Sequence, residues 1–84
     1  MPVLSRFYGI IIRMYFQQAE HNPPHIHAIY AEDTAEITIK TKEVIDGHLP
    51  PKALAMAREW ITIHEEELLE MWETQEFKAL DPLE

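Results

Sequence analysis

Three histidines lie within seven residues of this chain, in the segment His21-Asn22-Pro23-Pro24-His25-Ile26-His27. Histidine is the side chain that suits both metal binding and proton transfer near neutral pH. A proline fixes φ at about −65° and drives the preceding residue out of the helical region, so the segment must be extended or turned. Side chains two positions apart in a strand share a face, so we expect His25 and His27 to point the same way, with His21 close by.

This spacing predicts either a metal site or an acid–base group. The candidate metal ligands are His21, His25 and His27, with a divalent ion such as zinc, because the chain has no cysteine to supply a thiolate. Without a metal, the candidate catalytic groups are His25, His27 and the more distant His64. The alternative is that the histidines are structural and bind no cofactor, which is the result that we expect from a metal titration.

Other candidate residues come from outside the histidine segment. His64 lies on the apolar stripe of the C-terminal helical region, and Glu67 follows on the same side one turn later. This pair could face the histidines across the core, or His64 could simply hydrogen-bond a backbone carbonyl. Arg6 and Arg13 are the cations of the first strand that could approach a phosphate. The candidate binding residues are therefore His21, Arg13 and Glu67.

The charge of the chain restricts its partners. The 84 residues carry a net charge of −8, and nine acids against one lysine fall within residues 59–84. Nucleic-acid binders usually carry a basic patch, so DNA or RNA binding is disfavoured. No apolar run approaches the ~20 residues of a membrane span, and no signal peptide is recognisable, so we expect a cytoplasmic protein. A protein partner or a homodimer is consistent with this composition.

The apolar periodicity changes once along the chain, at Leu49-Pro50-Pro51. Alternating apolar residues predict strands over 6–16, 25–31, 35–41 and 43–46, joined by short connections and therefore antiparallel. In the strand over 35–41 we expect Ala35, Ile37 and Ile39 to face inward and Glu36 to face water. Helical spacing follows over 51–76, a length of about 39 Å. Thr62 and Glu65 resemble a capping box, which would divide this helix in two near Thr62. We expect one domain over 1–84, mostly β over 1–47, helical over 50–77, with a tail over 79–84.

Several segments together resemble an uncharacterised bacterial family, catalogued as domain of unknown function 4160 (DUF4160). The resemblance implies an α+β fold and a bacterial cytoplasmic protein, but no established chemistry. It also implies a gene next to that of a second small protein, as in toxin–antitoxin pairs. The segments that carry it are Ser5–Ile12, His21–His27, Leu49-Pro50, Glu59-Trp60, His64–Trp72 and Pro82-Leu83-Glu84.

The sequence thus predicts an α+β fold, with an antiparallel sheet of three to four strands. A long C-terminal helix, kinked or split in two, packs on one face of this sheet. Two functions are consistent with it. One is a toxin–antitoxin-like component acting through a site at His21, His25 and His27, as a hydrolase or RNase-type toxin. The other is a non-catalytic protein-interaction module with an acidic helix.

Overall fold

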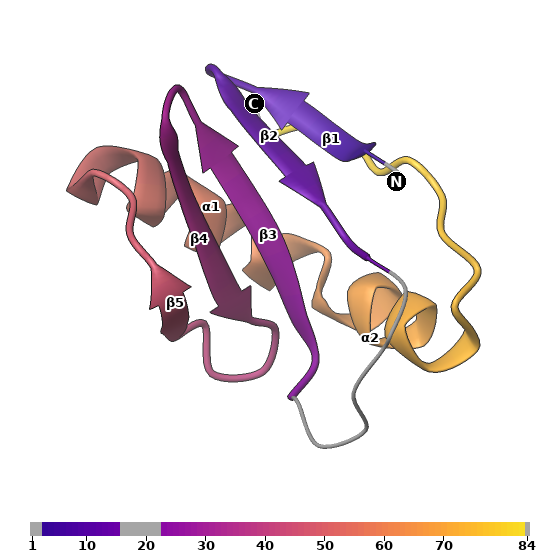
Figure 1. The fold of residues 1–84 in the computed structure, drawn as a ribbon. Helices are drawn as coiled ribbons and strands as arrows, with labels where there is room; N and C mark the ends of the chain where they lie inside the picture. The colour runs from indigo at the N-terminus through magenta and orange to yellow at the C-terminus, as the bar shows by residue number, and fades with distance from the viewer. Residues whose placement is uncertain (1–2, 16–22, 84) are drawn as a thin grey trace.

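The computed structural model describes residues 3–15 and 23–83, and its strands form one antiparallel sheet whose spatial order follows the chain. The α+β class is confirmed, with five strands in place of three to four. Figure 1 shows the strands followed by two helices: β1 (Val3–Phe7), β2 (Ile10–Arg13), β3 (His25–Tyr30), β4 (Asp33–Thr38), β5 (Val44–Gly47), α1 (Pro51–Ile63) and α2 (Glu65–Thr74).

The additional strand arises because the segment expected as one strand over 6–16 is a hairpin. Tyr8 and Gly9 form a two-residue turn, with φ of 50° and 81° respectively. Positive φ at both central residues is the geometry of a type I′ turn, whose twist matches that of the two flanking strands. The chain therefore reverses at Gly9, and Phe7 becomes the register partner of Ile10. Phe16, the predicted end of the strand, lies outside the described residues.

The helical region is split in two, and the break is at His64. Pro51 opens α1 at a first-turn position, as expected of a residue without an N–H to lose. The predicted capping box is wrong: the Thr62 hydroxyl donates back to the carbonyl of Arg58, and His64 is the N-cap of α2 without a side-chain cap. The break lets both helices follow the sheet, which one straight helix of about 39 Å would overrun.

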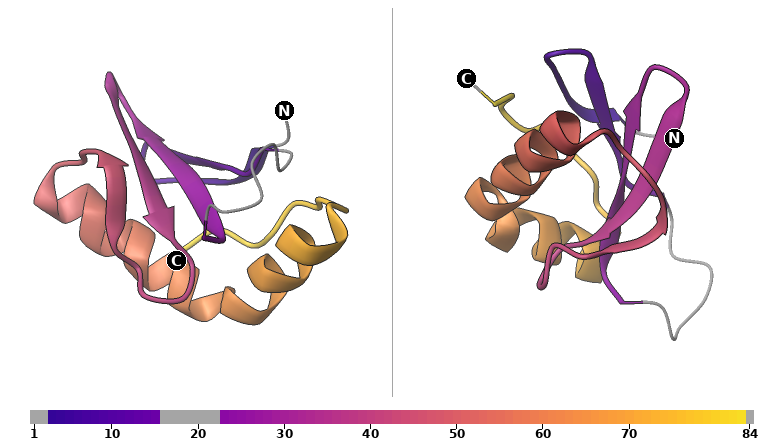
Figure 2. Two further views of the ribbon diagram at one scale, coloured as in Figure 1. Left: turned by 60° about the horizontal axis from the view of Figure 1, so that its bottom comes forward. Right: turned by 90° about the vertical axis from the view of Figure 1, so that its left-hand side faces the viewer.

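Both helices lie on the same face of the sheet, and the other face has no helix on it (Figure 2). Buried and more exposed residues alternate along β2, where Ile10 and Ile12 are buried while Ile11 is half-buried. The expected inward positions of β4 and its continuation, Ala35, Ile37 and Ile39, are all buried. The helices contribute buried residues at Ala53, Ala57, Trp60, Ile61, Leu68, Met71 and Trp72.

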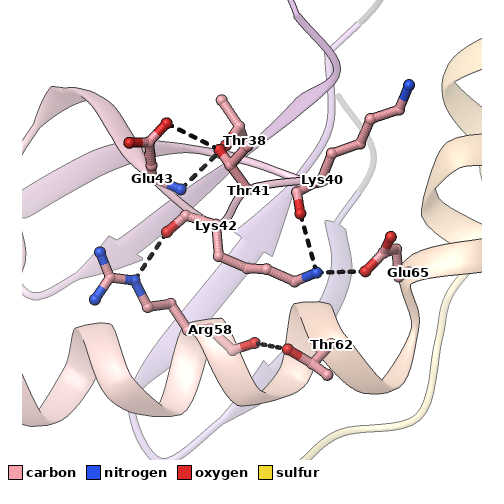
Figure 3. Close-up of polar contacts among 8 residues, drawn as sticks. All are labelled: Thr38, Lys40, Thr41, Lys42, Glu43, Arg58, Thr62 and Glu65. Atoms are coloured by element: carbon pink, nitrogen blue, oxygen red, sulfur yellow. Dashed lines mark hydrogen bonds and ion pairs between the residues drawn. The ribbon is translucent and has the colours of Figure 1, made fainter.

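A group of polar contacts joins the β4–β5 connection to both helices (Figure 3). Lys42 has a φ of 62°, its carbonyl accepts a hydrogen bond from Arg58 Nε at 2.8 Å, and its ammonium group pairs with Glu65. Arg58 belongs to α1 and Glu65 to α2, so a single loop residue is tied to both sides of the helix break.

The residues after α2, expected to be a tail, pack against the body of the protein. The N–H of Leu80 donates to the carbonyl of Leu4 in β1 at 2.7 Å, and Leu83 is buried. The carbonyl of Asp81 accepts a hydrogen bond from Trp60 Nε1 at 2.8 Å. Within the described part of the chain, neither helix is long and apolar enough to cross a membrane.

Candidate functional site

A row of polar residues crosses the sheet on the face that carries no helix. Arg13 of β2 is the register partner of His27 of β3. His27 is also paired with Glu36 of β4, and Glu36 with Asp46 of β5. Register partners project from the same face of a sheet, and Ile26, the residue before His27, is fully buried on the opposite face. The row therefore runs from a cation at Arg13, through His27, to two carboxylates.

The two prolines position His25 at the start of β3. Pro24 extends the hydrogen bonding between β3 and the chain after β4, because its carbonyl accepts a hydrogen bond from the N–H of Ile39 at 3.0 Å. The carbonyl of Pro23 lies 2.9 Å from His25 Nδ1. A carbonyl can only accept, so Nδ1 carries the proton and donates it. The other ring nitrogen, Nε2, lies 3.4 Å from Glu36 Oε1.

His25, His27 and Glu36 form the one group of potential metal ligands found among the described residues. Each offers a ligand atom, and these three atoms lie within 4.8 Å of one another. The imidazole rings of His25 and His27 are 5.2 Å apart between centroids. All three side chains come from the β3–β4 hairpin, and all are half-buried. The hairpin alone thus supplies two imidazoles and a carboxylate to one place.

Two aromatic side chains border this group. Tyr15, just beyond β2, contacts the ring of His27 edge-on, with centroids 4.4 Å apart and planes at 77°. Trp72 of α2 packs on His25, with centroids 5.1 Å apart. These contacts restrict rotation of both imidazoles and exclude part of the surrounding water.

The pKa of His27 is lowered from its ordinary value, chiefly because burial removes water from the charged imidazolium. The neighbouring His25 lowers this pKa further, whereas Glu36 and Asp46 act in the opposite direction. Burial prevails, so His27 is neutral at neutral pH and keeps a ring nitrogen with a free lone pair, the form that ligates a metal or accepts a proton.

The structure places His64 outside this group. Its Nε2 donates to the carbonyl of Asp81 at 3.0 Å, and its Nδ1 lies 3.3 Å from Glu67 Oε1. Its ring packs on that of Trp60, 4.8 Å away between centroids. His64 and Glu67 are therefore brought together as expected, but they hold the C-terminal segment against the helices. Glu67 also lies 3.6 Å from Lys78 Nζ.

Of the other residues predicted for the site, Arg13 lies beside His27 in the row described above, and His21 falls outside the described residues. Glu36 was expected to face water and was not among the predicted site residues. The signal that could have found it is the length of the β3–β4 turn. A two-residue turn at Ala31-Glu32 pairs Tyr30 with Asp33 and therefore sets Glu36 opposite His27.

The model of one protein family, described as "Domain of unknown function (DUF4160)", matches residues 9–73, which include Arg13, His25, His27 and Glu36. No curated protein and no solved structure was found to match the chain. The family match covers well over half of the chain and agrees with the resemblance seen in its sequence. The chain belongs to the DUF4160 family.

Proposed function

We propose, in place of the metal-free histidines expected from the sequence alone, that His25, His27 and Glu36 bind a divalent transition-metal ion such as zinc, and that the protein acts through this site as a hydrolytic, toxin–antitoxin-like component. The observation that carries the proposal is the orientation of His25. Its Nδ1 hydrogen donates to the Pro23 carbonyl, so a neutral ring turns the lone pair of Nε2 toward the Glu36 carboxylate 3.4 Å away. A proton or a metal ion between these two acceptors would stabilise the arrangement, and His27 supplies a third ligand atom that favours the metal ion.

The donor set fits a metal ion. Two histidines and one carboxylate are the protein ligands of many catalytic zinc sites and of non-haem iron sites. Metal-ligating histidines usually donate their second ring N–H to a carbonyl or carboxylate, as His25 does to Pro23. Ligands of one tetrahedral zinc ion are about 3.3 Å apart, so the three atoms, which lie within 4.8 Å of one another, would have to move closer together by up to about 1.5 Å.

A divalent ion with three protein ligands keeps a position for water or substrate and supplies Lewis-acid and water-activating chemistry. The side chains have separate tasks. His25 is held in one orientation by Pro23 and Trp72. His27 is kept neutral by burial, and Glu36 offsets part of the charge of the ion.

The test is a zinc titration of tag-free protein at pH 7.5, repeated at pH 5.5. We expect the metal affinity of a His25→Ala/His27→Ala variant to fall by at least about a hundredfold, and that of Glu36→Gln by at least about tenfold. At pH 5.5 the wild-type affinity also falls, because protons compete for the imidazoles. His48→Ala is the matched control, because His48 is exposed and pairs only loosely with Asp33, at 3.7 Å.

Zinc binding no tighter than about millimolar would contradict the proposed metal site. Equal zinc affinities in the double variant and the wild type would contradict it as well. The toxin–antitoxin part is tested by expressing the protein in bacteria without its neighbouring gene. Slowed growth that depends on His25 and His27 supports a toxin. Growth and transcripts that match the empty-vector control would contradict it.

The second candidate, a non-catalytic interaction module, is favoured by the surface of α2. Glu66, Glu70 and Glu73 are exposed and lie at helical spacing on one face. This acidic face would dock a basic protein, such as the product of an adjacent gene. A stable complex that survives His25→Ala/His27→Ala but is lost on Glu66→Lys/Glu70→Lys would favour this function over hydrolysis.

A further inference from the structure

Arg13 carries a polar group for which residues 3–15 and 23–83 supply no partner. Its Nε is buried, and no hydrogen-bond acceptor for it is present among the residues that the structure describes. Leaving a buried donor unpaired costs free energy, and a charged donor costs more than a neutral one, so such groups in native proteins are nearly always paired. Arg13 therefore has an unused donor beside the candidate site, and a ligand that displaces the atoms covering Nε would supply the acceptor.

The position of Arg13 defines where that ligand would lie. Arg13 is the register partner of His27, so the two side chains leave the same face of adjacent strands. Glu36 and then Asp46 follow on the far side of His27. With a divalent ion bound, the part of the row between Arg13 and the ion carries positive charge. The part from Glu36 to Asp46 carries negative charge. An anion is attracted on the β2 side of the ion and repelled on the β5 side.

Phosphate is the anion that this pair of cations fits best. A guanidinium group presents parallel N–H donors that match two oxygens of a phosphate, and a divalent ion takes a further oxygen. The whole chain carries a net charge of −8, which repels a long polyanion such as RNA but can be offset locally for a small one. The charges therefore favour a small phosphorylated molecule.

We infer that Arg13 and the metal site of the proposed function together bind the phosphate group of a small molecule; this inference rests on the metal proposed above. Arg13 is a binding residue in this arrangement, and it orients the phosphate relative to the ion held by His25, His27 and Glu36.

The experiment uses the full chain loaded with cobalt(II), whose visible absorption changes when an anion enters its coordination sphere. Inorganic phosphate, phenyl phosphate and a short oligothymidylate are titrated at constant ionic strength. We expect Arg13→Gln to weaken phosphate binding by about tenfold or more, the effect of losing a charge-assisted hydrogen bond, while cobalt binds at least as tightly as in the wild type because a neighbouring cation is removed. Arg6→Gln is the matched control, because it removes the same charge from an exposed position in β1.

Equal losses in Arg13→Gln and Arg6→Gln would overturn the inference, since only the overall charge would then matter. Cobalt binding without any phosphate binding would overturn it while leaving the proposed function standing. Absence of cobalt binding would overturn both. Tighter binding of the oligothymidylate than of phenyl phosphate would overturn the small-molecule assignment.

Discussion

The backbone carbonyl of Pro23 determines which nitrogen His25 presents to its neighbours. Because proline has no N–H and a fixed φ, the two prolines before β3 limit the conformations that this stretch of backbone can adopt. The hydrogen bond from Nδ1 then selects one tautomer of His25. The ring nitrogen that His25 presents to Glu36 thus depends on backbone geometry two positions away.

The lowered pKa of His27 predicts a pH-dependent stability in the metal-free protein. The unfolded chain binds a proton at its ordinary pKa of about 6.5, whereas the folded protein binds it only at lower pH. Lowering the pH therefore favours the unfolded state. The free energy of unfolding decreases as the pH falls through about 6.5 toward the pKa of the folded state. We expect urea unfolding with chelator present to show a larger drop from pH 7.5 to 5.5 for the wild type than for His27→Gln. Equal drops would contradict the prediction.

At the scale of elements, most of the fold could be predicted because apolar spacing differs between strands and helices. Ile37 and Ile39 were expected to face inward and are buried. The hairpin at Tyr8-Gly9 could not be predicted in this way, because the segment is apolar on both faces and hides the one-residue shift in alternation that the turn introduces between Phe7 and Ile10. The helix break was expected near Thr62 and falls at His64. The position of the break follows from the packing of the two helices on the sheet. The spacing of apolar residues along the helical region does not indicate this packing.

From the sequence, only the part of the candidate site that lies on β3 could be predicted. The spacing of His25 and His27 indicated a shared face, and the structure brings their rings together. Glu36 could not be assigned because the turn was expected over Glu32–Thr34. The observed turn has Ala31 at a φ of 54°, a value uncommon for a residue other than glycine. A change of one residue in the turn changes every pairing across the hairpin, and with it the third ligand.

The two glycines predict different responses to the same substitution. Both have positive φ, so alanine is strained at either position. At Gly9 the added Cβ would meet only the ring of Tyr30, at 3.4 Å, and we expect a loss of about 1 kcal/mol. At Gly47 it would collide with the carbonyl of Thr34, which accepts from the N–H of His48. Gly47→Ala should therefore cost about 1–3 kcal/mol more in urea unfolding. Equal costs would show that β5 can shift away.

His64 is predicted to stabilise the fold without serving the metal site. His64→Leu removes its hydrogen bond to Asp81, but Trp60 still donates to that carbonyl. We therefore expect a loss of about 1 kcal/mol in the free energy of unfolding and zinc affinity within about twofold of wild type. Thermal unfolding and the zinc titration measure the two effects. A large fall in zinc affinity with unchanged stability would instead make His64 part of the site.

For the whole molecule, the acidic charge and the candidate site lie on different layers. Nine acids fall within residues 59–84, which form the end of α1, α2 and the segment after it. One face of the sheet carries no helix (Figure 2), and the register and burial of the strands place the row from Arg13 to Asp46 on that face. This separation allows the acidic face to bind a protein partner while the sheet face binds a small anion, so the two proposed functions are compatible in one molecule.

Each strand pairs with the strand before it in the chain, and this order has a consequence for folding kinetics. Register partners lie at most 20 residues apart, as Ile10 and Tyr30 do, and chains of lower contact order fold faster. The three proposed ligands span only residues 25–36, so their hairpin can form before the helices dock. We expect zinc to accelerate refolding, measured by stopped-flow fluorescence of Trp60 and Trp72, because it stabilises a structure present in the transition state. If zinc only slows unfolding, the hairpin forms late, after the helices have closed the core.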